Sequence, residues 1–194
     1  MQPQMDFLGV RILREGTTVD PAKIAGLSDW PQNIKNLKGA QSFIGVVGYH
    51  RMFVPKFSQI AAPITKLFSK DVPFEWGPEQ QAAQEELIHR VTHTPVLVCP
   101  DPSRQFELEV DASQIATGGI LYQRDPLVTL PSSKRKAGPR HPIGFTSAKF
   151  SNTEQNYPIY DREFLAIMRG LRMWSHLLKG TKILVLVFTD HANL

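Results

Sequence analysis

The stretch Phe106-Glu107-Leu108-Glu109-Val110-Asp111 alternates apolar with acidic residues, and this alternation decides the fold class. A period of two is typical of a β-strand that packs one face against a core. Residues 117–123 and 141–147 are predicted to form two more strands. The basic segment between them joins these two strands into a wide hairpin.

A long helix and a fourth strand are expected to follow. Pro158 lies near the helix start and Gly180 ends the helix. Residues 183–188 are all apolar, which predicts a strand in the middle of a covered sheet, beside a parallel neighbour. Three strands, a crossover helix and a fourth strand indicate an α+β or α/β fold with the helix on one face. The predicted apolar stripe of the helix comprises Phe164, Ile167, Met168, Leu171, Trp174 and Leu178.

The chain before Pro102 follows a different pattern. A β-hairpin is predicted from 7–13 and 17–19, joined by the turn-like Arg14-Glu15-Gly16. Helical spacing follows, with Asp20-Pro21 as a helix start. Helices are expected after Pro21, over 34–47, around 60–67 and over 79–91. We therefore expect three regions: a hairpin in 1–19, a helical segment in 20–100, and the strand-rich domain in 101–194.

Composition restricts the class of protein. The 194 residues are 42% hydrophobic, which is enough to form a core. No apolar run approaches the length of a membrane span, and the N-terminus lacks the features of a signal peptide. We therefore expect no membrane partner and an intracellular location, cytoplasmic or nuclear. The single cysteine, Cys99, excludes an internal disulfide framework and a zinc site built on several cysteines, and we assign it no role.

Positive charge is concentrated in one segment. The formal net charge is +4, and the excess lies in residues 124–140, which are also rich in Pro, Ser and Gly. This composition predicts a basic loop that attracts phosphates. A solubilising surface loop would have the same composition. The cations are Arg124, Lys134, Arg135, Lys136 and Arg140, against the single acid Asp125.

Three carboxylates occupy positions that the predicted topology brings together. Asp111 ends the first strand, Glu163 lies in the first turn of the long helix, and Asp190 follows the fourth strand. If the first and fourth strands are neighbours, all three meet at one sheet end. Clustered carboxylates favour Mg²⁺ or Mn²⁺, which phosphodiester hydrolysis uses in pairs. Each residue alone has a simpler explanation, in the helix dipole or in a turn.

Several motifs make the resemblance to a known family specific. In order along the chain they are Leu108-Glu109-Val110-Asp111-Ala112-Ser113, Gly118-Gly119-Ile120-Leu121-Tyr122-Gln123, His141-Pro142-Ile143-Gly144-Phe145-Thr146-Ser147, Glu154-Gln155-Asn156-Tyr157, Arg162-Glu163-Phe164-Leu165-Ala166-Ile167 and Thr189-Asp190-His191-Ala192-Asn193-Leu194. This order resembles the RNase H domain of gypsy-class LTR retrotransposon reverse transcriptases. The resemblance implies that Asp111, Glu163 and Asp190 bind Mg²⁺ or Mn²⁺ and cut the RNA strand of an RNA–DNA hybrid.

The upstream chain resembles the end of the polymerase in the same polyproteins. Phe7-Leu8-Gly9 is similar to the primer-grip hairpin, and residues 20–100 are similar to the thumb and connecting segment. The resemblance implies a nucleic-acid partner for the helical segment as well as for the basic loop. The expected contacts are Gly45, Tyr49, Arg51, Lys134, Arg135, Lys136 and Arg140.

The sequence also departs from the family pattern. The adjacent aspartates of the polymerase site are absent, so we do not expect DNA synthesis. The family's fourth acidic residue and fifth strand would lie beyond Leu194, so we expect at most one well-formed metal site and an impaired or inactive nuclease. An exposed edge of strand 183–188 would also favour self-association. The alternatives are a nucleic-acid-binding remnant without activity and a domesticated or decayed element.

Overall fold

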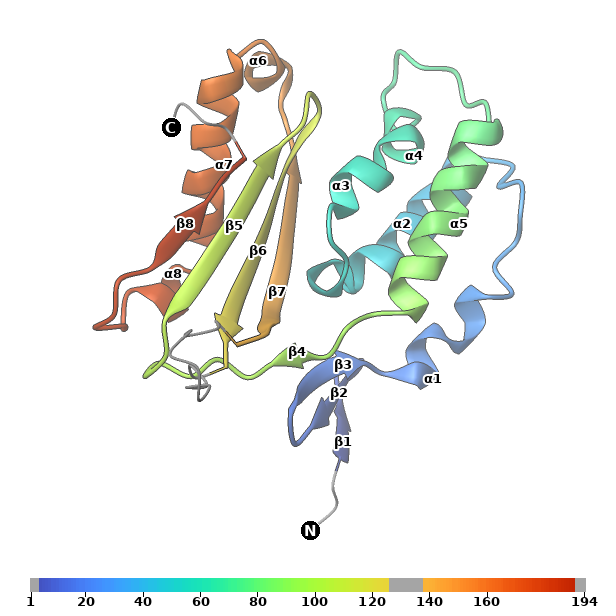
Figure 1. The fold of residues 1–194 in the computed structure, drawn as a ribbon. Coiled ribbons are helices and arrows are strands. Elements are labelled where there is room, and N and C mark those ends of the chain that lie inside the picture. Colours follow the sequence, from blue (N-terminus) through green and yellow to red (C-terminus); the bar gives the residue numbers. More distant parts are fainter. Residues whose placement is uncertain (1–3, 126–137, 191–194) are drawn as a thin grey trace.

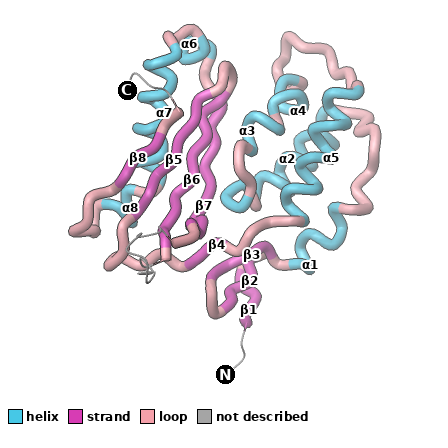
Figure 2. Tube along the Cα trace, viewed as in Figure 1, coloured by secondary structure: helices cyan, strands magenta, loops and turns pink. Residues whose placement is uncertain are grey.

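The structure is a computed structural model that describes residues 4–125 and 138–190. A small N-terminal sheet, a group of helices and a larger sheet with its own helix follow one another along the chain (Figure 1). The larger sheet and its helix lie on one side of the molecule, and helices α2 to α5 lie on the other (Figure 2). The predicted α+β or α/β class, with a helical segment before three strands, a crossover helix and a fourth strand, is confirmed.

The N-terminal sheet has the strand order β1-β2-β3-β4. The prediction of a single strand over residues 7–13 was wrong, because the chain reverses at Leu8 and Gly9, whose φ angles are 48° and 78°. The predicted turn at Arg14 and Glu15 does join β2 to β3. The strands are β1 (Gln4–Phe7), β2 (Val10–Leu13), β3 (Gly16–Val19) and β4 (Leu97–Val98).

The helices between β3 and β4 form a separate core. Asp20 caps the first helix as predicted, and Asn36 caps α2 by accepting a 2.8 Å hydrogen bond from the Gly39 amide. The predicted helix around residues 60–67 is interrupted at Ala61. The elements are α1 (Pro21–Ile24), η1 (Ala25–Leu27), α2 (Leu37–Tyr49), η2 (Arg51–Phe53), α3 (Phe57–Ile60), α4 (Ala62–Lys66) and α5 (Pro78–Thr92).

The larger sheet has the strand order β7-β6-β5-β8, as the sequence predicts. Strands β5 (Phe106–Ala112), β6 (Ala116–Arg124) and β7 (Arg140–Lys149) are antiparallel neighbours. Strand β8 (Leu186–Phe188) lies parallel to β5. The helices that connect β7 to β8 are α6 (Asn152–Gln155), α7 (Ile159–Met173) and α8 (Ser175–Leu178).

Two details of the predicted crossover were wrong. The fourth strand is shorter than residues 183–188, and its three residues are exposed instead of being covered on both faces. Its place at the edge of the described sheet agrees with the expected exposed edge. The predicted apolar stripe is also shifted around the helix, because Phe164 and Met168 are exposed whereas Glu163, Ala166 and Gly170 are buried. The helix therefore turns a partly polar face toward the sheet.

Three apolar clusters hold these parts together. One fills the helical segment, and a second lies between the larger sheet and α7, where Leu108 and Val110 meet Ala166 and Trp174. The third cluster joins all parts, since its buried members come from β3, η2, β4 and β7. These members are Val19, Phe53, Leu97 and Phe145. The helical segment consequently packs directly against the larger sheet.

Candidate active site

The larger sheet brings Asp111, Glu163 and Asp190 together. Asp111 lies near the end of β5, and Asp190 lies two residues beyond the parallel strand β8, so both occupy the same end of neighbouring strands. Helix α7 crosses this sheet and presents Glu163 from its first turns. One carboxylate oxygen of each residue lies within 4.8 Å of those of the other two.

Gly170 allows helix α7 to pack closely against strand β5. A Cβ atom at residue 170 would lie 3.1 Å from both methyl carbons of Leu108 and 3.3 Å from Cγ1 of Val110. These distances are shorter than ordinary van der Waals contacts, so a larger residue would push the helix away from β5. The close packing of the helix therefore fixes the distance between Glu163 and the end of β5.

Glu163 is 2% exposed and lies deepest of the three carboxylates. Its oxygens accept hydrogen bonds from the Ala112 amide at 3.3 Å and from the Thr189 hydroxyl at 3.2 Å. Burial raises the pKa of Glu163 above its usual value, and the negative charges of Asp190 and Asp111 raise it further, although the two hydrogen bonds oppose this shift. Ionised Glu163 is thus held in an unfavourable environment unless a cation is present.

Asp111 and Asp190 are more accessible. The side chain of Asp111 is 33% exposed, and it forms an ion pair with Lys56, whose Nζ lies 2.5 Å from Oδ2. Asp190 is exposed. A pocket of about 510 Å³ opens beside both residues, between β5, β6, the end of β8 and the segment that precedes α3. A polar ligand can therefore reach the two carboxylates from solvent.

The chemistry of the donor set fits a divalent cation. All three candidate ligands are carboxylates, which suit Mg²⁺ and Mn²⁺. The repulsion that raises the pKa of Glu163 is the repulsion that such a cation would relieve. The second hydrogen bond to Glu163 comes from Thr189, directly before Asp190, so the candidate ligands also have polar neighbours that orient them.

The predicted nucleic-acid contacts of the helical segment do not line the pocket beside the carboxylates. Gly45 and Tyr49 are exposed on one face of α2, and the Tyr49 hydroxyl donates a hydrogen bond to the carbonyl of Leu8. Arg51 is exposed and directs Nη2 to the Ser147 carbonyl at 3.4 Å. The role of these residues in binding nucleic acid stays a prediction.

Arg140 is held against the sheet. Its guanidinium pairs with Glu107 at 2.8 Å and with Glu109 at 2.7 Å, and it lies over the rings of Tyr122 and Phe188. Arg124 pairs with the other oxygen of Glu107 at 2.6 Å. These ion pairs neutralise buried Glu107, so both arginines have a structural role at the end of the β6–β7 hairpin.

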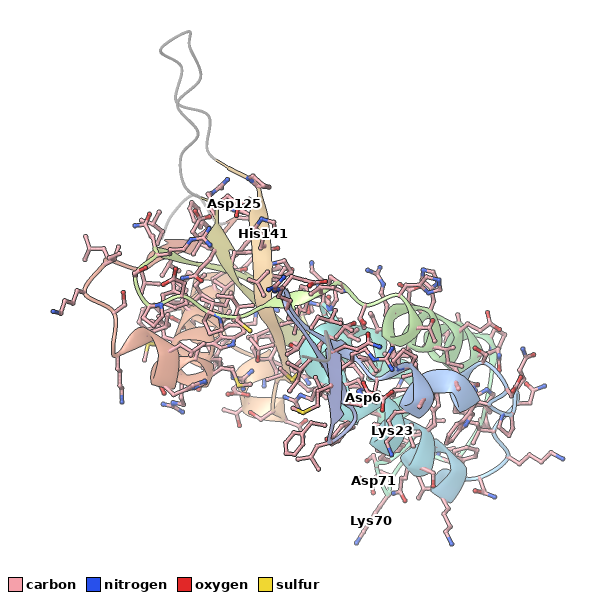
Figure 3. The ribbon with its side chains drawn as sticks, turned by 90° about the horizontal axis from the view of Figure 1, so that it is seen from below. Asp6, Lys23, Lys70, Asp71, Asp125 and His141 are labelled. Atoms are coloured by element: carbon pink, nitrogen blue, oxygen red, sulfur yellow. The ribbon has the colours of Figure 1, made fainter. Side chains whose placement is uncertain are left out.

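The base of the hairpin is closed by a further pair. The His141 ring donates a 2.9 Å hydrogen bond to Asp125, and this bond lowers the pKa of the Asp125 carboxyl. Figure 3 shows the two side chains facing each other where the hairpin strands end. The remaining predicted phosphate contacts, Lys134, Arg135 and Lys136, lie outside the described residues.

Sequence reasoning missed two residues of this site. Thr189 could have been suspected from its position beside Asp190. Lys56 could not, because it lies 55 residues before Asp111 in a different predicted region and only the packing of the helical segment on β7 brings it near. A single lysine between Pro55 and Phe57 carries no recognisable pattern.

The fold and the acidic cluster define the class of protein. A model of the RNase H-like domain found in reverse transcriptase matches residues 76–185, which is more than half of the chain. The chain belongs to this family. The match includes Asp111 and Glu163.

Particular relatives agree with this assignment. The chain is 37% identical over 193 residues to the Tf2-3 and Tf2-4 transposon polyproteins of Schizosaccharomyces pombe, with 100% of this chain and 14% of each relative covered. It therefore spans about a seventh of the length of these curated relatives.

Solved structures show the same fold. A foamy viral protease-reverse transcriptase in complex with an RNA/DNA hybrid matches with a TM-score of 0.76 and 21% identity, covering 99% of this chain and 24% of that one. The same foamy viral protein in complex with double-stranded DNA matches with a TM-score of 0.73 and 21% identity, over 100% and 38% of the two chains.

In the part of the chain that the structure describes, no helix is long and apolar enough to cross a membrane.

Proposed function

We propose that this chain is the portion of a retrotransposon reverse transcriptase that carries its RNase H-type site, that the site derives from an enzyme that hydrolyses the RNA strand of an RNA–DNA hybrid, and that this activity is impaired in the chain alone. The observation that carries the proposal is the convergence of Asp111, Glu163 and Asp190 within 4.8 Å, on three elements, beside an open pocket. The gypsy class and the division at residues 19 and 100 form part of the same proposal.

Each carboxylate has a distinct place in the proposed site. Asp111 lies near the end of β5, beside the parallel strand β8, and with Glu163 and Asp190 it would hold Mg²⁺ or Mn²⁺. When bound, a divalent cation stabilises the charge that develops on the phosphate oxygens during hydrolysis. Glu163, held by Thr189 and the Ala112 amide, would keep its orientation while Asp111 and Asp190 face the ligand.

A nucleic-acid ligand is supported by the pocket and by the related folds. The pocket beside Asp111 and Asp190 is open to solvent, as an extended polymer requires. One solved structure of the same fold is described in complex with an RNA/DNA hybrid. Basic residues 134–136 and the exposed face around Gly45, Tyr49 and Arg51 would bind the duplex backbone.

The test is cleavage of an end-labelled RNA–DNA hybrid by the purified chain with Mg²⁺ or Mn²⁺. We expect weak cleavage of the RNA strand, because at most one cation site is well formed, and chelation or Asp111→Asn should abolish this cleavage. The matched control is Asp71→Asn, because Asp71 is exposed and does not line the pocket beside the carboxylates. Binding of the hybrid without metal-dependent cleavage would contradict the nuclease and favour a binding remnant.

A further inference from the structure

The helical segment contributes a positively charged side chain, Lys56, to the carboxylate site. Nζ of Lys56 lies 2.5 Å from Oδ2 of Asp111, and Lys56 lines the same pocket as Asp111 and Asp190. Among the described residues, no other Lys, Arg or His forms an ion pair with the three carboxylates. The ammonium group therefore lies directly beside one of the three candidate ligands.

The backbone around Lys56 is fixed in an unusual conformation. Lys56 has φ 54° and ψ 29°, in the left-handed region that residues other than glycine seldom adopt. Its carbonyl accepts hydrogen bonds from the amides of Gln59 and Ile60, and the next residue, Phe57, is buried in the helical core. Its surroundings therefore hold the backbone of Lys56 in one conformation.

The larger sheet holds the same segment from the other side. The Ser58 amide donates a 3.0 Å hydrogen bond to Oγ of Ser147 on β7. The stem of Lys56 extends over Gly118, where a Cβ atom would lie 3.8 Å from Cγ of the lysine, and Gly118 is the cross-strand partner of Asp111. The lysine stem therefore runs along β6 at the register position that pairs with Asp111.

We propose that Lys56 is an internal counter-ion that competes with the divalent cation for Asp111. This inference rests on the proposed metal site. An ammonium group and a divalent cation on one carboxylate repel each other, so cation binding and the Lys56–Asp111 ion pair oppose one another. In the absence of a cation, Lys56 neutralises part of the charge that the cluster accumulates. Cation binding releases Lys56 toward the pocket and weakens one contact between the helical segment and the larger sheet.

The test measures cation affinity directly, by calorimetric titration of the purified chain with Mn²⁺ and with Mg²⁺ at low ionic strength. Lys56→Gln removes the charge from a side chain that is 56% exposed, so the fold should tolerate it. Lys56→Asn does the same while favouring the left-handed backbone. The matched control is Lys66→Gln, because Lys66 is an exposed lysine of the same helical segment that forms no ion pair with any described residue.

We expect both Lys56 variants to bind the cation about two- to fivefold more tightly than the wild type, as a partly exposed ion pair allows, and Lys66→Gln to bind like the wild type. Unchanged or weaker affinity in both Lys56 variants, with saturable binding in the wild type, would overturn the competition and leave the metal site intact. If neither the wild type nor any variant binds Mn²⁺ or Mg²⁺, both the proposed competition and the proposed metal site are overturned.

Discussion

Glu163 shows how one residue links the stability of the fold to its proposed chemistry. The carboxyl is buried beside two other carboxylates, and burial is the first cause of its raised pKa. Because the folded-state pKa is higher than the unfolded one, the folded protein binds the proton more tightly. The contribution of this group to stability is complete below the unfolded pKa and is lost as pH rises through the folded pKa.

Glu163→Gln should therefore stabilise the metal-free protein at neutral pH. The amide keeps a hydrogen bond from the Ala112 amide and donates to the Thr189 hydroxyl, while the ionisable group is removed. The stability gain should shrink as pH falls toward about 4, the ordinary range of a glutamate pKa, because the wild-type carboxyl is then protonated in both the folded and the unfolded protein. Urea unfolding between pH 4 and pH 8 measures it, with Glu75→Gln as an exposed control. If Glu163→Gln is less stable than the wild type at pH 7, ionised Glu163 does not destabilise the metal-free fold.

At the scale of elements, the contact between α7 and β5 sets the geometry of the site. Gly170→Val should lower the free energy of unfolding by about 1–3 kcal/mol, since the added carbons overlap Leu108 and Val110. It should also weaken Mg²⁺ binding, because Glu163 moves with the helix. Gly45→Val is the matched control, since no described atom lies within 4 Å of a Cβ atom at this other helical glycine. Equal thermal stability of the two variants would refute the close packing.

The edge of the larger sheet is a second element with a measurable consequence. Leu186 and Val187 of β8 are 39% and 40% exposed, and no other described strand pairs with the outer side of β8. An exposed apolar edge favours pairing with another chain. We predict concentration-dependent self-association that Leu186→Lys reduces, measured by light scattering. Leu184→Lys, which adds the same charge outside the strand, is the control. A wild-type chain that stays monomeric at high micromolar concentration would exclude this edge contact.

The elements also show which features the sequence can predict. The alternation in β5, the cap at Asp20 and the helix over Pro78–Thr92 depend on local patterns, so they were predicted. The exposed edge of β8 was expected as well, but its short length was not, because an apolar run does not show how many of its residues pair with a neighbouring strand. The face of α7 was misjudged for a related reason, since the helix turns Glu163 and Gly170 inward and leaves Phe164 exposed.

For the whole molecule, the packing of the helical segment on the larger sheet matters most. Phe53 and Phe145 share one cluster, which places the segment before α3 beside the carboxylates. The three carboxylates could be predicted because one sheet topology unites them. Lys56 and the pairing of Arg140 with Glu107 could not, because both depend on contacts between distant parts of the chain.

Hybrid binding should depend on salt through the basic segment. Replacing Lys134, Arg135 and Lys136 together with Gln should lower the slope of log affinity against log salt by roughly one for each phosphate that is no longer neutralised. Arg140 is left unchanged because it pairs with Glu107 and Glu109. Fluorescence anisotropy between roughly 50 and 200 mM salt would measure the slope, because the effect is large in this range. An unchanged slope would assign the phosphate binding to other residues.

The central claim is that Asp111, Glu163 and Asp190 together form one divalent-cation site. Its most direct measurement is calorimetric titration of Mn²⁺ into the wild type and into Asp111→Asn, Glu163→Gln and Asp190→Asn, with Glu75→Gln as the control. We predict saturable binding to the wild type and the control, and a decrease of roughly tenfold or more in affinity for each of the three variants. Binding that is indifferent to all three substitutions would contradict the site.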